Sequence, residues 1–376
     1  MDFTKLDKFI DDMPKRGIPM FDLAVSYKGE TVYRHMSGHS DEALTVPTSE
    51  NDLYWIFSNT KVTTCIAAMR LVEEGKIALD DKLSKYIPEF EKMFVRNQDG
   101  SITPAKNPIT LLHVFTMTAG FDYNLNAAPI KEAVAAGGYT LDVARAISKM
   151  PLGFEPGTRY RYSLCHDVLA AVVEVASGIR FSDFTDKFIF KPLEMSDTCF
   201  RPTEEQKARI SAMYNYHGGI NKAIPTESTN RYYSLTDNYD SGGAGLCSSV
   251  SDYLKMLTAL AIGGTAKNGY RLLKPETIEM MGKNFLCDDA RKDFSTSRCH
   301  GYGWGLCGRA HVDPTVSFSL SSVGEFGWDG AAGALSVVDP TKQIAIYLGT
   351  HVKGCQYIYH WIHPRIINMV IEALGA

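Results

Sequence analysis

The chain has 376 residues, of which 45% are hydrophobic and 22% are charged, and its formal net charge at pH 7 is −4. A globular chain of this length and composition can bury enough surface to fold without a metal ion or a disulfide framework. The slightly negative net charge does not imply a basic face, which argues against nucleic acid as a partner.

The N-terminus and the cysteines bear on cellular location. Residues 1–15 alternate charged and apolar side chains and lack the continuous apolar core of a signal peptide. No later stretch has the roughly 18 apolar residues that a membrane-spanning helix needs. The eight cysteines include no C-x-x-C pair, so we interpret them as reduced, buried thiols. We therefore expect a cytoplasmic protein with no membrane partner.

The first elements are a helix, a hairpin and a second helix. An amphipathic pattern predicts a helix over residues 2–15. Two runs rich in β-branched and aromatic residues flank a turn at 28–30 and predict a hairpin over 21–37. Apolar residues recur at helical spacing over 61–74, and Gly75 ends this pattern.

The rest of the chain is helical at first and then returns to strands. Residues 76–240 carry helical patterns broken by proline and glycine, and the polar segments 97–108 and 214–240 predict loops. Residues 334–349 predict a second hairpin, and an amphipathic pattern over 360–374 predicts a last helix.

Strand-rich ends around a helical middle predict an α+β fold, in which an antiparallel sheet built from both termini is flanked by helices and a helical domain is inserted. We expect residues 1–65 and 245–376 to form the α/β domain and residues 66–244 to form the mainly helical domain. The active site is expected in the cleft between the two domains.

Ser58 and Lys61 form an S-x-x-K motif at the start of the second predicted helix. Residues three apart share a helix face, so the Lys61 ammonium can reach the Ser58 hydroxyl. A lysine can activate a serine when burial or a nearby cation lowers its proton affinity, and a helix start directs N–H groups at the reacting oxygen. Such a match occurs by chance about once or twice in a chain of this length, which leaves open a solvent-facing pair.

Two further segments carry candidate chemistry. In PGTRYRYSL, residues 156–164, a Pro-Gly turn precedes Tyr162, whose phenol beside a cation could relay protons or could simply pack. Asp167 could cap the helix that follows, and His166 could tune Tyr162 or pack. In FGWDGA, residues 326–331, glycines would let backbone amides approach a substrate, and the alternative is a tight turn with a packed tryptophan. Trp304 and Tyr54 could line an acyl pocket or belong to the core.

The order of these motifs resembles the penicillin-recognising serine hydrolases: class C β-lactamases, D-alanyl-D-alanine peptidases and, most of all, family VIII carboxylesterases. Similar segments extend over nearly the whole chain: LDDKL at 79–83, ITLLH at 109–113, TAG at 118–120, PLEM at 192–195, GGAGL at 242–246 and GYGWG at 301–305.

The resemblance implies a β-lactamase/transpeptidase-like fold and a role for each motif. Ser58 would be the acylated nucleophile, Lys61 its base, and Tyr162 the proton shuttle that later activates the deacylating water. The backbone N–H groups of Ser58 and Ala331 would form the oxyanion hole. No cofactor and no metal ion are implied.

Two departures favour an esterase over a lactamase. Leu164 replaces the asparagine that binds the acylamino group in lactamases, and Tyr162-Ser163-Leu164 is similar to the Y-S-L of family VIII esterases. Trp328-Asp329-Gly330 replaces Lys-Thr-Gly, so an apolar wall stands where lactamases hold a substrate carboxylate. Asp329 departs even from the esterase Trp-Gly-Gly: it either faces the pocket and repels anions or is a turn residue.

We therefore expect a serine carboxylesterase that hydrolyses small or hydrophobic esters through an acyl-enzyme, with acyl transfer to alcohols as a further outcome of the same intermediate. Its partner would be a small-molecule ester. The expected substrate-binding residues are Leu164, Trp328, Asp329 and Gly330. The alternatives are a β-lactamase or D-alanyl-D-alanine carboxypeptidase on the same fold, and a non-catalytic ligand-binding sensor. Because the acylation machinery is shared, the esterase could retain weak β-lactam hydrolysis as a side activity.

Overall fold

The computed structural model describes residues 1–226, 235–295 and 299–376, and its largest element is an antiparallel sheet of seven strands in the order β2-β1-β13-β12-β11-β10-β9. The strands are β1 (Met20–Tyr27), β2 (Glu30–Gly38), β9 (Tyr302–Trp304), β10 (Arg309–His311), β11 (Phe326–Gly327), β12 (Leu335–Asp339) and β13 (Ile344–Gly349). Because β1 pairs with β13, strands from the two ends of the chain lie side by side within the sheet. The predicted antiparallel sheet built from both termini is therefore present.

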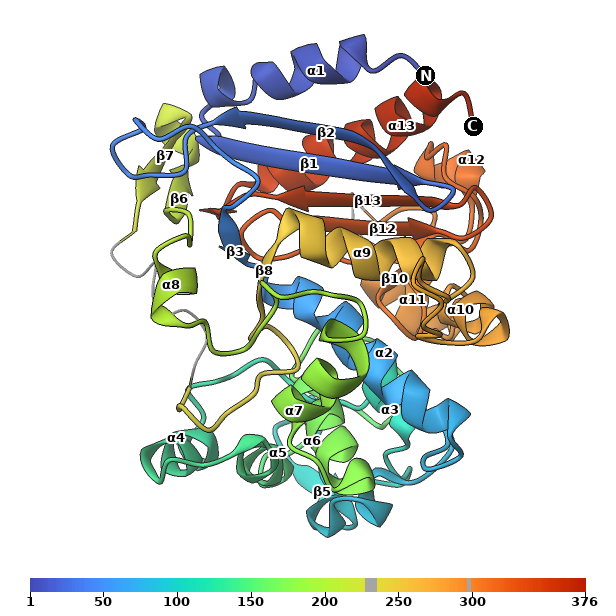
Figure 1. Cartoon of the computed structure of the whole chain (residues 1–376). Helices are drawn as coiled ribbons and strands as arrows, with labels where there is room; N and C mark the ends of the chain where they lie inside the picture. Colours follow the sequence, from blue (N-terminus) through green and yellow to red (C-terminus); the bar gives the residue numbers. More distant parts are fainter. Residues whose placement is uncertain (227–234, 296–298) are drawn as a thin grey trace.

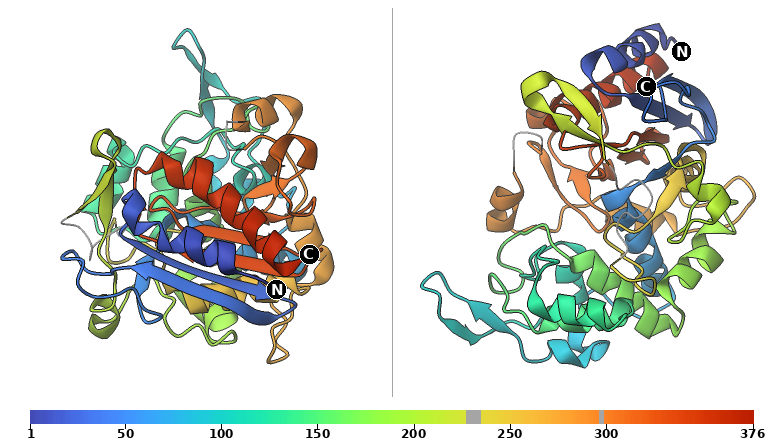
Figure 2. Two further views of the ribbon diagram at one scale, coloured as in Figure 1. Left: turned by 90° about the horizontal axis from the view of Figure 1, so that it is seen from above. Right: turned by 90° about the vertical axis from the view of Figure 1, so that its left-hand side faces the viewer.

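Helices cover both faces of this sheet. The terminal helices α1 (Thr4–Asp11) and α13 (His363–Leu374) lie side by side over one face, and α9 (Val250–Ala261) lies under the other (Figures 1 and 2). Helix α1 is shorter than the predicted span of 2–15, because a separate 3₁₀ turn (Pro14–Arg16) follows it and ends at Gly17, whose φ is +82°. A π-helical turn (Ile358–Ile362) precedes α13.

Helix α2 (Thr60–Glu73) lies between α9 and a group of helices on the far side that includes α6 (Cys165–Ser177) and α7 (Phe181–Thr185) (Figure 1). Its residues from Thr60 to Met69 are all buried, which matches a sequence of small and apolar side chains with no charged face. It packs against α6 and α7. The other helices are α3 (Leu111–Phe115), α4 (Ala128–Ala135), α5 (Thr140–Ser148), α8 (Glu204–Lys207), α10 (Pro275–Met281), α11 (Asp288–Phe294) and α12 (Pro314–Ser317). The boundary proposed at residue 65 falls inside α2, and the two-domain division stays a prediction.

Two segments that we expected to be loops contain short hairpins. Strand β4 (Phe94–Arg96), just before the first of these segments, pairs with β5 (Ile102–Pro104) inside it, and in the second segment β6 (Tyr214–His217) pairs with β7 (Lys222–Pro225). Strand β6 also pairs with β14 (Val352–Lys353). Most residues of these strands are exposed or half-buried, and each strand has only three or four residues, too few for a clear pattern in the sequence. The rest of the expected loop, residues 227–234, lies outside the described residues.

Strands β3 (Leu53–Trp55) and β8 (Cys247–Ser249) form a separate antiparallel pair that brings the segment before Ser58 next to the segment after Gly243. All eight cysteines are free thiols, and Cys287 is exposed, contrary to the expectation that all are buried. None of the helices formed by the described residues is long and apolar enough to cross a membrane.

Candidate active site

A tight turn presents Ser58 at the start of α2. The chain leaves β3 and enters a 3₁₀ turn (Phe57–Asn59) that runs directly into the helix. Phe57, the residue before the serine, has a φ of +48°, a conformation that bulky residues rarely adopt and that is often found at functional sites. The surrounding chain leaves Ser58 9% exposed.

The structure brings together the three residues expected to carry the chemistry. The Lys61 ammonium lies 3.3 Å from the Ser58 hydroxyl oxygen, and the Tyr162 hydroxyl donates a hydrogen bond to the same oxygen at 2.7 Å. Lys61 is fully buried and its Nζ lies 4.7 Å from the centre of the Tyr162 ring. An amine and a phenol thus flank one hydroxyl at distances that allow proton exchange.

Trp328 contributes more than the apolar wall that we expected. Its indole N–H donates a hydrogen bond to the Tyr162 hydroxyl at 3.1 Å, and the two rings stack with centroids 5.6 Å apart. A neutral donor therefore stands beside the phenol, at the position where the lactamase pattern has a lysine. The sequence could not indicate this bond, because it depends on how two segments far apart in the chain are oriented.

A buried carboxylate supports Lys61 from behind. Lys61 donates to the carbonyl oxygen of Gly243 at 2.7 Å. Asp167 accepts hydrogen bonds from the hydroxyls of Tyr239 and Ser241, both at 2.6 Å, and from the N–H of Gly243 at 3.2 Å. A Cβ at Gly243 would lie 2.3 Å from Asp167 Oδ2, so only glycine fits. Asp167 is thus not the expected helix cap, because α6 already begins at Cys165.

Three other candidates are structural. Burial, and then the positive charge of Lys61, lowers the pKa of the His166 imidazole to about 3, so this side chain is neutral and bonds the Phe115 carbonyl at 3.0 Å. Trp304 is buried, and its indole N–H donates to the same carbonyl at 3.1 Å. Tyr54 is also buried. Trp304 and Tyr54 therefore belong to the core, one of the two alternatives we left open.

Ser58 and Tyr162 line a cavity of about 350 Å³ together with Trp328, Asp329, Gly330 and Ala331. A Cβ at Gly330 would lie 2.4 Å from the carbonyl oxygen of Ile56, so this glycine lets the turn after β11 approach the nucleophile segment. The described residues contain no hydrogen-bond acceptor for the N–H of Ser58 or Ala331. Both residues line the cavity, and the oxyanion hole that they would form stays a prediction.

Two expected substrate-binding residues differ in their placement. Leu164 is fully buried at the N-cap of α6 and does not line the cavity, because its backbone N–H bonds the Asp122 carbonyl at 3.1 Å and holds it in the core. Asp329 does line the cavity, and its carboxylate lies 3.9 Å from Nδ1 of His363, on the side of α13.

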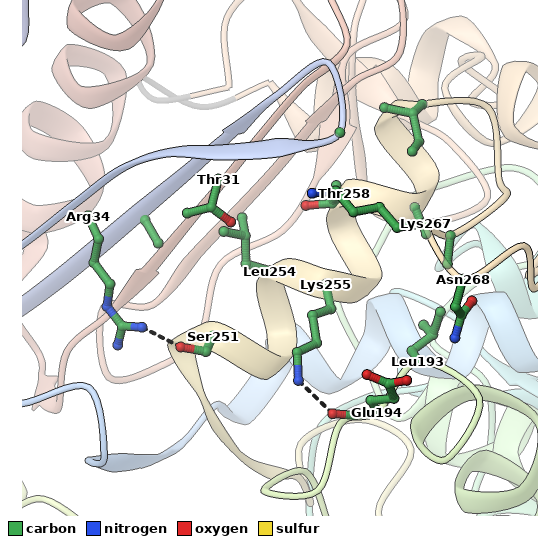
Figure 3. A pocket seen from close by; sticks show the side chains of 15 residues that line it. Thr31, Arg34, Leu193, Glu194, Ser251, Leu254, Lys255, Thr258, Lys267 and Asn268 are labelled. Carbon is green, nitrogen blue, oxygen red and sulfur yellow. Dashed lines mark hydrogen bonds between the residues drawn. The ribbon is translucent and has the colours of Figure 1, made fainter.

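Another cavity of about 340 Å³ lies away from Ser58, between α9 and the β1–β2 hairpin (Figure 3). Its cationic side chains are already paired: Arg34 with Asp22 at 2.8 Å, Lys255 with Asp252 at 2.8 Å and Lys267 with Glu30 at 2.5 Å. Arg34 also donates to Ser251, and Lys255 to the carbonyl of Glu194, across the groove in Figure 3. These pairs stabilise the packing of α9 and engage all three cationic side chains that line the cavity.

Comparisons with known proteins agree with this architecture. The sequence matches the family described as Beta-lactamase over residues 6–354. Esterase EstB from Burkholderia gladioli is 29% identical over 357 residues, which cover 87% of this chain and 84% of EstB. A putative D-alanyl-D-alanine carboxypeptidase from Salmonella heidelberg (strain SL476) is 28% identical over 371 residues, 92% of this chain and 81% of that protein.

Solved structures share the fold. EstCE1, described as a hydrolase with promiscuous acyltransferase activity, has a TM-score of 0.81 at 22% identity, and the match covers 100% of this chain and 98% of EstCE1. The expected α+β, β-lactamase-like fold is confirmed by this match and by the family match.

Proposed function

The chain belongs to the beta-lactamase family, and we propose that it is a serine carboxylesterase that cleaves small or hydrophobic esters through an acyl-enzyme. The observation that carries the proposal is a single hydroxyl, that of Ser58, within hydrogen-bonding reach of both Lys61 and Tyr162 at the wall of a cavity. The similarity to esterase EstB supports the same activity.

In the proposed mechanism, Ser58 Oγ attacks the ester carbonyl and gives up its proton to the Lys61–Tyr162 pair. The N–H groups of Ser58 and Ala331 hold the developing oxyanion. Tyr162 then protonates the leaving alcohol oxygen. In the second half a water molecule gives its proton to Tyr162 and attacks the acyl carbon. The Ser58 Oγ–acyl bond then breaks, the Lys61–Tyr162 pair returns a proton to Oγ, and the acid leaves.

The charge around the cavity favours neutral esters over β-lactams, which are anionic. Among the described residues that line it, two are acidic, Asp293 and Asp329, and none is lysine, arginine or histidine. Asp293 is engaged by Arg159 through a bidentate ion pair. A carboxylate-bearing substrate would therefore meet no cation to replace its lost hydration.

Acyl transfer belongs to the same proposal, because an alcohol can replace water in the second half-reaction, and EstCE1 is a hydrolase with acyltransferase activity. We place the reaction in the cleft between the two predicted domains, with a small-molecule ester as the partner. A cytoplasmic location completes the proposal and is supported by eight free thiols.

Hydrolysis of p-nitrophenyl butyrate tests the function. We expect turnover by the parent protein and a loss of about 10³-fold or more in kcat for Ser58→Ala, since the residual rate comes from binding alone. A fluorophosphonate probe should label Ser58 in the parent. The control variant Ser148→Ala, at the C-terminal end of α5, should keep both ester turnover and labelling.

Three results would contradict the proposal. Absence of ester turnover together with an unlabelled Ser58 would exclude the proposed esterase activity. Faster turnover of a chromogenic cephalosporin than of any simple ester would favour the lactamase. Equal ligand binding by the parent and by Ser58→Ala, without turnover in either, would favour the sensor.

A further inference from the structure

A further cavity of about 320 Å³ adjoins the catalytic one. The two cavities share four lining residues, namely Cys299, Trp328, Asp329 and Tyr359. The second cavity extends from this shared wall between α13 and the segment 314–319. A group attached to an ester carbonyl at Ser58 has this space directly beyond Trp328.

The outer wall of the second cavity is apolar and exposed. Residues 314–324 contain no charged side chain. Val316 and Phe318, which line the cavity, are 45% and 79% exposed. Asn368 fixes the segment, since its side chain donates to the Phe318 carbonyl at 3.0 Å and accepts from the Leu320 N–H at 2.9 Å. An aromatic ring held in water beside a cavity offers apolar surface that a ligand can cover.

The inner part of the cavity combines apolar contacts with polar side chains, of which Arg309 and His363 are engaged by other groups of the chain. Leu335 and Ile367 are buried there. Arg309 is buried and paired with Glu325 at 3.1 Å, and His363 bonds the Gly333 carbonyl at 2.9 Å. These engaged polar groups favour an uncharged occupant.

The shared wall indicates which part of an ester reaches this space. Trp328 donates to the hydroxyl of Tyr162, the group that must face the leaving alcohol oxygen in order to protonate it. The alcohol portion therefore lies on the Trp328 side of the catalytic serine. Ala331, the proposed oxyanion donor, lines the catalytic cavity and is absent from the lining of the second.

We propose that this second cavity is the alcohol subsite, and that Val316 and Phe318 select esters of bulky, uncharged, hydrophobic alcohols. The inference rests on the proposed esterase function. In acylation the Ser58 Oγ–acyl bond forms, the acyl–alkoxy bond breaks and the alcohol leaves with a proton from Tyr162. In transfer an acceptor alcohol occupies the same subsite, gives its proton to Tyr162 and forms a bond to the acyl carbon. The Ser58 Oγ–acyl bond then breaks and the Lys61–Tyr162 pair returns a proton to Oγ, so the subsite also selects acceptors.

Acetate esters isolate the alcohol subsite, because all of them form the same acetyl-enzyme. We expect Phe318→Asn to lower kcat/KM for 1-naphthyl acetate about tenfold, the effect of losing one large apolar contact, and Val316→Ser to lower it about threefold. Both variants should hydrolyse ethyl acetate within about twofold of the parent. Asparagine tolerates the positive φ of residue 318, which is +54°, so folding is preserved.

Val323→Ser is the matched control, since Val323 is 59% exposed on the same segment but does not line the cavity. It should leave the ratio of 1-naphthyl to ethyl acetate turnover unchanged. Partition of the acetyl-enzyme between water and benzyl alcohol gives an independent readout: Phe318→Asn should shift it toward water by about the same factor, with methanol transfer unaffected.

Two outcomes would overturn the subsite. An equal loss for ethyl and 1-naphthyl acetate would mean that Phe318 acts on the fold. A changed ratio of p-nitrophenyl octanoate to acetate turnover, with the acetate series unchanged, would assign the cavity to the acyl group. Either result leaves ester turnover and Ser58 labelling intact, whereas failure of the esterase proposal abolishes both.

Discussion

Replacing Trp328 by phenylalanine tests whether the indole N–H assists Tyr162. The substitution removes the donor that lies 3.1 Å from the Tyr162 hydroxyl and keeps an aromatic ring in the stack, whose centroids are 5.6 Å apart. Because Trp328 is 6% exposed, its replacement opens a small space without creating an unpaired buried polar group. The chemistry at the phenol is what changes most.

The size of the effect follows from the charge that forms on the phenol oxygen. When Tyr162 holds the negative charge of a lost proton, the N–H bond becomes charge-assisted and is worth about 1.5–3 kcal/mol. At about 1.4 kcal/mol per tenfold change in rate, its loss lowers kcat/KM about 10- to 100-fold. An apolar wall alone would predict a change of less than about threefold.

The assay is kcat/KM for p-nitrophenyl acetate in a double-mutant cycle with Tyr162→Phe. We expect Trp328→Phe to lower the rate in the parent and to have almost no further effect in the Tyr162→Phe protein, because the two residues act through one bond. Trp361→Phe, which removes an indole that stacks on Phe9 at 5.4 Å, is the control and should be silent. Equal losses in both backgrounds, or none in either, would refute the reasoning.

Two further variants test the carboxylates of Asp167, behind the active site, and of Glu174, both in helix α6. Asp167→Asn removes the carboxylate that accepts hydrogen bonds from Tyr239, Ser241 and Gly243, so we expect the free energy of unfolding in urea to fall by about 2 kcal/mol and ester kcat to fall about tenfold. The control is Asp186→Asn on the surface, and unchanged values of both quantities in Asp167→Asn would contradict this role. Burial, together with the Asp240 carboxylate, raises the pKa of Glu174 from 4.5 to about 7. Its contribution to stability is therefore present below pH 4.5 and is lost as the pH rises through about 7. The free energy of unfolding of Glu174→Gln should therefore increase relative to that of the parent by on the order of 2 kcal/mol between pH 5 and 8. A difference in melting temperature that does not change with pH would contradict the raised pKa.

Local patterns predicted some of the elements of the fold well. The hairpin expected over 21–37 is present as β1 and β2, and the helix expected over 61–74 spans Thr60–Glu73. In both cases the information is local, namely a turn between two apolar runs and a repeat of buried positions. The hairpin of β6 and β7 was missed because each strand has only four residues, and the other pairing of β6, with β14, joins residues more than 130 positions apart.

The candidate site divides in the same way. Ser58 and Lys61 share one turn of chain, and the order of the motifs was enough to add Tyr162. Asp167 could not be assigned its role, because its hydrogen-bond donors lie 72 to 76 residues further along the chain. Leu164 was assigned to the substrate by analogy with a position in a motif, whereas its side chain turns into the core at the start of α6.

The electrostatics of the site connect its mechanism to its substrate. Lys61 is a fully buried amine, and it lies between the Gly243 carbonyl, which Asp167 holds in place, and the electron-rich face of Tyr162. A lysine at 328 would bring a second ammonium to the same phenol and would also offer a cation to a substrate carboxylate. Trp328 supplies the hydrogen bond without the charge. The side chain that supports Tyr162 therefore also directs the site toward neutral esters.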